Sequence, residues 1–171
     1  MIKIDNFLSN TEYEKVWEEF HIFKWEMDQV GTTEEDQTFQ RQFWYKELLE
    51  SEYIHNLFKL KVEHLLNARV VTDRLYGNGQ AHGQCAQIHQ DQYTDTPGNY
   101  KSLVYYLHRN WIPQYGGHLI FVDGDKVTNS VFPDTNSCVL FDSKLFHMAL
   151  EPSVYCTRQR VSIAYKFKVE E

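Results

Sequence analysis

The sequence lacks an excess of basic residues, and it also lacks long apolar runs, internal repeats and low-complexity tracts. Its 171 residues carry 17 Lys and Arg against 24 Asp and Glu, which gives a net charge of −7. Nucleic-acid binding needs a Lys and Arg excess to displace counterions from phosphates, so we expect no nucleic-acid partner. No apolar stretch approaches the length of a membrane span, so we expect no membrane partner either.

Cysteine is scarce and unpaired. Cys85, Cys138 and Cys156 are widely spaced, odd in number and without a CxxC motif. This usage argues against a disulfide framework or a zinc knuckle and is typical of reduced thiols. The sequence therefore predicts a protein of a reducing compartment, with the cytoplasm as the expected location.

What is present fits one globular domain. Hydrophobic residues make up 42% of the chain and charged residues 24%, an ordinary balance for a folded protein. A chain of this length can bury a core without staples, so we predict a single domain over residues 1–171. Within it, residues 1–68 form a supporting N-terminal half and residues 70–169 form the core.

The N-terminal half has the hydrophobic period of helices. Ser9 and Glu12 have the spacing of a capping box, and a second helix is expected within residues 50–68. Between the two helices, residues 31–45 are polar and could form a mobile loop that leads into a strand. The apolar stripes of the two predicted helices are Tyr13, Val16, Trp17 and Phe20, and then Ile54, Leu57, Phe58, Val62 and Leu65.

From about Val70 the apolar residues alternate with a period of two, which is typical of strands. Many short strands separated by turn signals favour an antiparallel sandwich or jelly-roll barrel. The fold class predicted from the residues is therefore α+β, mainly β, with the helices packed on one outer face. The predicted strands lie within residues 70–76, 84–89, 101–107, 117–122, 137–142 and 160–167.

His89 and Asp91 form a His-x-Asp pair, the first candidate for a metal site. Residues i and i+2 of a strand point to the same side, so both side chains can converge on one ion. A third ligand must come from elsewhere, and His118 and His147 are the histidines that could lie within later strands. His147 follows an apolar strand and could stand at a barrel mouth, although a hydrogen-bonded histidine in a half-buried strand is the alternative interpretation.

The last predicted strand adds a candidate anion site. Arg160, Ser162 and Ala164 share one face of residues 160–167. An arginine at the head of a face of small residues indicates an anion inside the barrel, because guanidinium matches a carboxylate with two parallel hydrogen bonds. Two histidines, one carboxylate and this arginine together suggest an iron(II) site with a dicarboxylate co-substrate.

Five motifs in a fixed order then carry a family resemblance. They are LYGNG (75–79), HQD (89–91), VYYLHRNWIPQYGGHLIF (104–121), FHMALEP (146–152) and RVSIAYKF (160–167). In this order they resemble the 2-oxoglutarate- and iron(II)-dependent dioxygenases, and among them the prolyl 4-hydroxylase group. The resemblance implies a double-stranded β-helix, or jelly-roll, core.

The resemblance also implies roles for individual residues. His89, Asp91 and His147 would bind Fe(II), and Arg160 would hold the far carboxylate of 2-oxoglutarate. Dioxygen would be the second co-substrate, with ascorbate as a possible additional reductant. Related halogenases have a small residue in place of the carboxylate, so Asp91 favours hydroxylation. The other residues expected around the co-substrate are Tyr106, Tyr76 and Ser162.

Two departures from the family pattern concern basic residues. Arg160 lies thirteen positions after His147, a longer interval than usual, and Arg158 is the alternative anion binder. We favour Arg160 because Arg-x-Ser followed by alternating apolar residues fits the closing strand of the family. Lys166 occupies a place where relatives often carry a tryptophan near the substrate, which bears on proline specificity.

The function implied by the resemblance is hydroxylation of a peptidyl proline with release of succinate and carbon dioxide, and residues 31–45 could act as a lid. A peptide or protein substrate is expected. The alternatives are hydroxylation of another residue or of a free small molecule on the same scaffold. A non-catalytic metal-binding jelly roll of cupin type is a further alternative, although it would not require an arginine such as Arg160.

Overall fold

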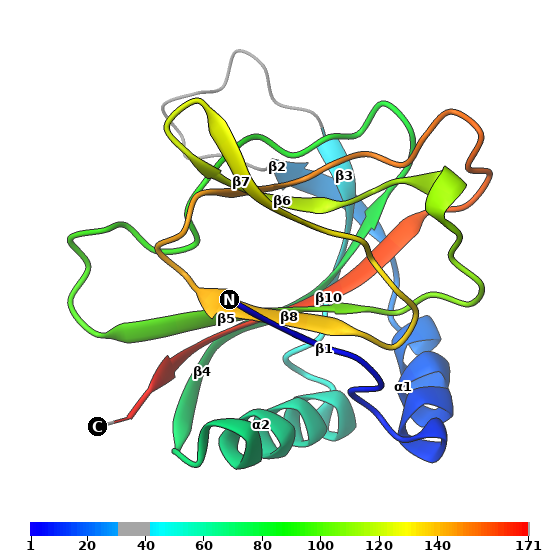
Figure 1. Cartoon of the computed structure of the whole chain (residues 1–171). Helices are drawn as coiled ribbons and strands as arrows, with labels where there is room; N and C mark the ends of the chain where they lie inside the picture. Colours follow the sequence, from blue (N-terminus) through cyan, green and yellow to red (C-terminus); the bar gives the residue numbers. More distant parts are fainter. Residues whose placement is uncertain (31–41, 171) are drawn as a thin grey trace.

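Two antiparallel sheets face each other in the computed structural model, which describes residues 1–30 and 42–170 (Figure 1). The smaller sheet has the order β7 (Lys126–Val131), β6 (Leu119–Asp123), β9 (His147–Ala149). The larger sheet has the order β1 (Ile2–Ile4), β8 (Cys138–Asp142), β5 (Asn99–Tyr106), β10 (Arg160–Val169), β4 (Val70–Gln80), β3 (Gln42–Glu47), β2 (Glu26–Val30).

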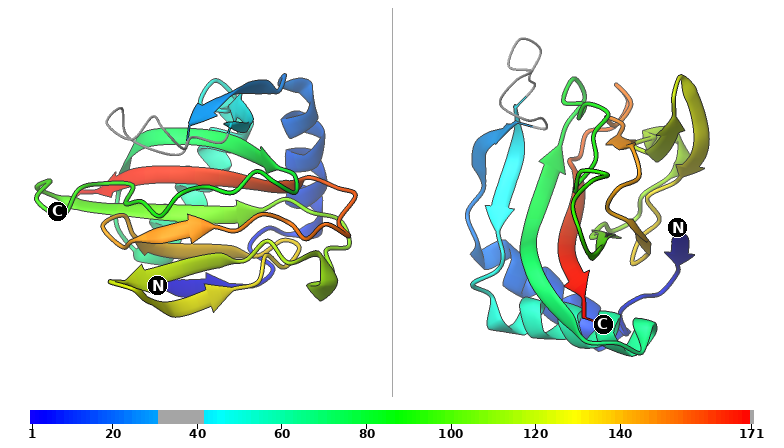
Figure 2. Two further views of the ribbon diagram at one scale, coloured as in Figure 1. Left: turned by 90° about the horizontal axis from the view of Figure 1, so that it is seen from above. Right: turned by 90° about the vertical axis from the view of Figure 1, so that its left-hand side faces the viewer.

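The helices α1 (Asn10–Ile22) and α2 (Glu52–Leu66) pack on the larger sheet, on the side away from the smaller sheet (Figure 2). One hydrophobic cluster joins helix residues such as Phe20 and Phe58 to Leu75, Ile163 and Tyr165 of the sheet. A second cluster occupies part of the space between the two sheets. This arrangement confirms the predicted mainly β, α+β jelly roll with helices on one outer face.

The helices begin where their sequences predict. Ser9 caps α1, and the side chain of Glu12 accepts a hydrogen bond from the Ser9 backbone amide, which completes the predicted capping box. Helix α2 is capped by Ser51 and ends at Asn67 in the left-handed conformation. The predicted apolar stripes face the core with one exception. Leu65 is 42% exposed, and its neighbour Leu66, four positions after Val62, packs against the core instead.

Strand β10 divides its side chains between the core and the space between the sheets. Its residues Ile163, Tyr165 and Phe167 belong to the cluster beneath the helices. The alternate residues, Arg160 and Ser162 among them, face the other way and line a pocket. The period of two along this strand thus builds the core and the candidate site from one segment.

Gly77 on β4 lets helix α1 lie directly against the sheet. A Cβ atom at this position would lie 2.5 Å from Cε2 of Phe20, a distance that real Cβ contacts do not show. A side chain here would therefore push α1 away from the sheet. This packing contact explains why the first glycine of the LYGNG motif, Gly77, has no side chain.

Three segments bear on the limits of the predicted secondary structure. Residues 84–89 do not form the predicted strand, because β9, their neighbour, is only three residues long and pairs with them as an isolated bridge at His89. Strand β7 lies in a segment for which the sequence predicted no strand, since its residues are mostly polar and exposed. Of the expected lid over residues 31–45, residues 31–41 lie outside the described residues, and residues 42–45 belong to β3.

No helix in the described part of the chain combines the length and apolar character needed to cross a membrane.

A buried histidine lies where β5 leaves the sheet. His108 is 4% exposed, and its ring stacks on Trp111 with the centroids 4.2 Å apart. Its Nε2 atom has no hydrogen-bond partner in the part of the chain that the structure describes. Burial, with a smaller contribution from the charge of Arg160, lowers the pKa of His108 to about 3. The folded protein therefore holds this imidazole neutral where the unfolded chain would protonate it.

This difference predicts acid sensitivity of the fold. Because unfolded His108 binds a proton below its ordinary pKa of 6.5 and folded His108 only below about 3, its contribution to stability is lost between these values as the pH falls. The loss should reach about 1.4 kcal/mol per pH unit. His108→Phe keeps a ring on Trp111 and should flatten the decline in urea-unfolding free energy between about pH 6.5 and about pH 4. His64→Phe, at an exposed position of α2, is the control. An unchanged pH profile in His108→Phe would contradict this account.

Candidate active site

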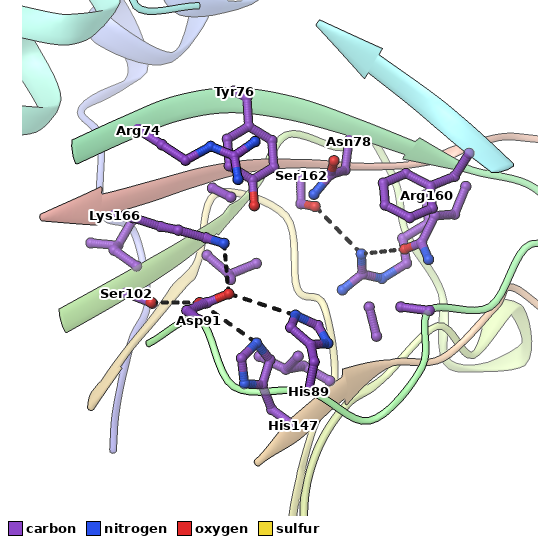
Figure 3. A pocket seen from close by; sticks show the side chains of 18 of the residues that line it. Arg74, Tyr76, Asn78, His89, Asp91, Ser102, His147, Arg160, Ser162 and Lys166 are labelled. Carbon is purple, nitrogen blue, oxygen red and sulfur yellow. Dashed lines mark hydrogen bonds and ion pairs between the residues drawn. The ribbon is translucent and has the colours of Figure 1, made fainter. Parts of the chain in front are cut away.

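A cavity of about 260 Å³ lies between the two sheets (Figure 3). Strands β4, β5 and β10 supply its wall on the larger sheet, and β6 and β9 contribute to the opposite wall. Its lining includes the residues for which the sequence predicts a metal or co-substrate role, apart from the fully buried Tyr106. The fold thus brings four distant segments of the chain to one place.

His89, Asp91 and His147 converge on one point of this cavity. One ligand atom from each residue lies within 4.8 Å of the others. Backbone hydrogen bonds fix the two segments, with the His89 amide donating to the His147 carbonyl at 3.0 Å and the reverse bond measuring 2.9 Å. The bridge that ends the irregular segment 84–89 therefore sets the distance between the two histidines.

Both imidazoles are oriented by their backbone contacts. Nδ1 of His89 donates to the carbonyl of Gln87, and Nδ1 of His147 donates to the carbonyl of Leu145, each at 2.8 Å. A carbonyl can only accept, so these bonds place the proton on Nδ1 and leave the Nε2 lone pair free when the ring is neutral. Burial lowers the pKa of His147 to about 4, which keeps the imidazole neutral at ordinary pH.

Asp91 is the charged centre of the cluster. Its Oδ1 lies 3.6 Å from Nε2 of His89, and its Oδ2 lies 3.7 Å from Nε2 of His147. Ser102 donates a hydrogen bond to Oδ2 at 2.6 Å, and the Lys166 ammonium lies 2.7 Å from Oδ1. Burial alone would raise the pKa of Asp91, but His89 and the charge of Lys166 outweigh it and hold the pKa far below its ordinary value. The carboxyl is therefore ionised.

This donor set suits a divalent transition metal. Two imidazole nitrogens and one carboxylate on one side of an ion leave the remaining positions open to other ligands. The hydrogen bonds to Nδ1 and to Asp91 provide the outer support that metal-binding side chains usually have. His89, Asp91 and His147 could therefore hold the metal that the sequence predicts.

Arg160 lies at another end of the cavity and is 1% exposed. Its Nε donates to the carbonyl of Gly117 at 2.7 Å, and its Nη1 donates to Gln80 at 3.0 Å. A longer contact of 3.4 Å joins Nη1 to Ser162. Nη2 is buried and has no hydrogen-bond partner among residues 1–30 and 42–170. A buried guanidinium with an unused donor could bind an anion at this end of the cavity.

Tyr106 offers a second unused donor near Arg160. The guanidinium carbon lies 5.3 Å from the centre of its ring, and no described residue forms a hydrogen bond with its buried hydroxyl. Burial raises the pKa of Tyr106 to about 12, so the hydroxyl keeps its proton. Nη2 of Arg160 and this hydroxyl are two donors that a carboxylate could satisfy together.

The tryptophan and the two glycines of the motif over residues 104–121 help to position the Arg160 side chain. Nε1 of Trp111 donates to the carbonyl of Gly116, and the carbonyl of Gly117 receives the Arg160 Nε hydrogen bond. Gly117 has a φ of +75°, and a Cβ atom there would lie 3.0 Å from Cδ of Arg160. A glycine is therefore needed at 117 both for its backbone conformation and for the approach of the arginine.

Of the remaining residues considered from the sequence, some line the cavity and others lie outside it. Tyr76 and Ser162 line the cavity. Arg158 is exposed, and its Nη1 donates to the carbonyl of Arg109, away from the cavity. His118, the other histidine considered as a third ligand, packs its ring against Phe132 and does not belong to the metal cluster. The structure therefore places Arg160, and not Arg158, in the cavity.

Several cavity residues were not predicted from the sequence, and three of them contact or pair with the candidate residues. Ser102 shares a strand face with Tyr106, so alternation along β5 could have found it. Gln80 lies directly across from Arg160, and Arg74 lies directly across from Lys166, in the pairing of β4 with β10. These two positions depend on strand register, which the sequence alone does not give.

Residues 74–167 match the family model of the 2OG-Fe(II) oxygenase superfamily. The chain belongs to this superfamily. The matched segment begins at Arg74 and includes the three residues of the metal cluster and Arg160. No curated protein matches the chain.

Solved structures of oxygenases share the fold at low sequence identity. A prolyl hydroxylase from Trichoplax adhaerens, in complex with a peptide fragment of the hypoxia inducible factor oxygen degradation domain, is 17% identical, with a TM-score of 0.71, and the match covers 98% of this chain and 82% of that chain. A Pseudomonas putida prolyl-4-hydroxylase is 19% identical, with a TM-score of 0.60 and coverage of 99% and 92%. HygX from Streptomyces hygroscopicus, with nickel, 2-oxoglutarate and hygromycin B bound, is 13% identical, with a TM-score of 0.69 and coverage of 98% and 82%.

Membership of this superfamily makes the chain a 2-oxoglutarate-dependent dioxygenase, with iron(II) as its cofactor and 2-oxoglutarate as its co-substrate. Its own residues fit both. The cluster of two imidazoles and one carboxylate suits iron(II), and the unpaired Nη2 of Arg160 and hydroxyl of Tyr106 suit a carboxylate.

The position of Arg160 leads to a direct prediction about the co-substrate. Arg160→Gln should raise the Kd of 2-oxoglutarate at least about 10-fold, because a hydrogen bond to a charged group contributes about 1.5–3 kcal/mol. The measurement is calorimetric titration of the Mn(II)-loaded protein. Arg158→Gln, at the exposed rival position, should change Kd by less than about twofold, because it touches no part of the cavity.

Retained Mn(II) binding by both variants would show that each is folded. A larger effect of Arg158→Gln than of Arg160→Gln would contradict the role inferred for Arg160.

Proposed function

We propose that this chain is an iron(II)- and 2-oxoglutarate-dependent hydroxylase of the prolyl 4-hydroxylase type, acting on a peptidyl proline. The observation that carries the proposal is one cavity that holds the cluster of His89, Asp91 and His147 together with the unpaired Nη2 of Arg160. A metal-binding jelly roll without catalytic activity would have no use for that buried guanidinium, and the family match disfavours it further.

In this proposal the chain's own side chains position the reactants. His89, Asp91 and His147 would hold iron(II) from one side. When bound, iron(II) and 2-oxoglutarate supply the oxidative chemistry: 2-oxoglutarate and dioxygen give succinate and carbon dioxide, and one oxygen atom enters a C–H bond of the substrate. Asp91 stays ionised beside His89 and the Lys166 ammonium.

Arg160 and Tyr106 would bind the far carboxylate of 2-oxoglutarate. The guanidinium is preorganised by Gly117 and Gln80, so little conformational freedom is lost when the anion binds. Ser162 and Ala164 give the floor of the cavity small side chains, which leave room for the co-substrate. Leu119, together with Ala149, supplies apolar wall that limits access of water.

Exposed apolar residues next to the metal ligands in the sequence are compatible with a peptide substrate. Ile88 and Phe146 immediately precede His89 and His147, and both are exposed, as are Leu145 and Tyr93. The two prolyl hydroxylases with the same fold support the choice of proline.

The same scaffold can also serve a small molecule. HygX shares the fold and was solved with hygromycin B bound. Hydroxylation of another residue or of a free small molecule is therefore the second candidate, and a single assay separates it from the first.

The test combines succinate release with a mass measurement on peptides. The protein, Fe(II), 2-oxoglutarate and a panel of proline-containing peptides should give succinate and a peptide heavier by one oxygen atom. Chelation of the metal and the variant Asp91→Ala should each lower turnover at least about 100-fold, because either change removes an essential part of the metal site. The matched control is Asp95→Ala, at an exposed position in the same loop.

Turnover of 2-oxoglutarate without peptide modification would remove proline as the target and favour the second candidate. Absence of any turnover would contradict the oxygenase activity of this chain.

A further inference from the structure

Two basic side chains lie at the open end of the cavity, opposite each other on neighbouring strands. Lys166 on β10 pairs with Arg74 on β4 in the register of the larger sheet, so their Cα atoms are about 5 Å apart. Both side chains line the cavity. Like charges at directly opposed positions destabilise a sheet. The presence of Lys166 and Arg74 at these positions is therefore not explained by a contribution to strand pairing.

The pair lies at the other end of β10 from Arg160. Residues 160 and 166 point to the same side of the strand and are about 20 Å apart along it, at the usual rise per residue. Arg160 is 1% exposed, whereas the side chain of Lys166 is 14% exposed and Arg74 is exposed. Figure 3 shows Arg160 on one side of the cavity and Lys166 and Arg74 on the other. The exposure of Arg74 makes this second cationic end the open one, whereas Arg160 is enclosed.

The pair is incompletely balanced by carboxylates. Lys166 forms an ion pair with Asp91, but no acidic side chain among the described residues lies within ion-pair distance of Arg74. Both cations also lie over the ring of Tyr76, at 4.7 Å for Arg74 and 5.4 Å for Lys166. The ring eases their repulsion but carries no formal charge.

The described lining of the cavity carries a charge opposite to that of the whole protein. Among residues 1–30 and 42–170, the lining contains three cations, Arg74, Arg160 and Lys166, and one anion, Asp91, whereas the chain has a net charge of −7. Iron(II) and 2-oxoglutarate carry opposite charges of equal size, so their binding leaves this excess in place. A divalent ion on Asp91 would also take over the compensation of that carboxylate and leave the Lys166 ammonium available to another anion.

We propose that Lys166 and Arg74 bind a carboxylate of the prime substrate and so select an acidic substrate. This inference rests on the proposed function, because it assumes a substrate that reaches the metal cluster through the open end of the cavity. An ammonium and a guanidinium on adjacent strands can share one carboxylate, and Lys166 already contacts a carboxylate oxygen at 2.7 Å. The carboxylate could belong to an acidic residue of a peptide or to a free acid.

The test is a binding measurement that needs no turnover. The protein is loaded with Mn(II) and saturating 2-oxoglutarate and is titrated by calorimetry at fixed ionic strength with two matched pairs of probes. The first pair is Ac-Glu-Pro-Glu-NH2 and Ac-Gln-Pro-Gln-NH2. The second pair is N-acetylproline and N-acetylprolinamide. Each pair differs in charge and hardly in shape.

In at least one pair, the acid should bind at least about 10-fold more tightly than the amide, as expected for a charge-assisted contact in a partly enclosed site. Lys166→Met and Arg74→Gln should each reduce this preference to less than about threefold. Lys168→Met is the control, because Lys168 is an exposed lysine of the same strand that does not line the cavity. The pair that shows the preference identifies the source of the carboxylate.

Equal affinity of acid and amide in both pairs, including no measurable binding of any probe, would overturn the inference. So would a preference that survives in both cavity variants. The hydroxylation assay fails separately: a carboxylate preference without proline hydroxylation would contradict the proline target and leave the acidic substrate in place.

Discussion

The candidate site depends on a buried guanidinium that the fold holds but does not satisfy. Arg160 donates hydrogen bonds from Nε to the Gly117 carbonyl and from Nη1 to the Gln80 side chain. Its Nη2 has no hydrogen-bond partner among the described residues. An unsatisfied buried donor costs about 1–3 kcal/mol, so the folded protein carries a cost that a bound anion recovers. Much of the surrounding sequence serves this arrangement. Gly117 leaves space for the arginine, and Trp111 holds the adjacent Gly116 carbonyl.

The alternation of side chains along β10 links this interaction to the stability of the whole protein. One face of the strand supplies Ile163 and Tyr165 to the core beneath the helices, and the other face supplies Arg160 and Lys166 to the cavity. Because both faces belong to one rigid strand, the core fixes the positions of the two cationic ends. The metal cluster is less regular, since His89 is joined to β9 by an isolated bridge.

Local patterns predicted much of this, and long-range pairing accounts for what they missed. The spacing of His89 and Asp91 and the small-residue face after Arg160 can be read from the sequence, as can the capping box of α1. The strand predicted over residues 84–89 is wrong because an alternating pattern cannot reveal that its partner strand has only three residues. Arg74 was missed because its place opposite Lys166 depends on the register between β4 and β10.

The most direct test of this account is a crystal structure of the protein with Mn(II) and 2-oxoglutarate. We expect the far carboxylate of 2-oxoglutarate to lie within hydrogen-bond distance of Nη2 of Arg160 and of the Tyr106 hydroxyl. We expect the metal to be bound by His89, Asp91 and His147. A co-substrate held instead by Lys166 or Arg74, with Nη2 of Arg160 still unpaired, would contradict this account.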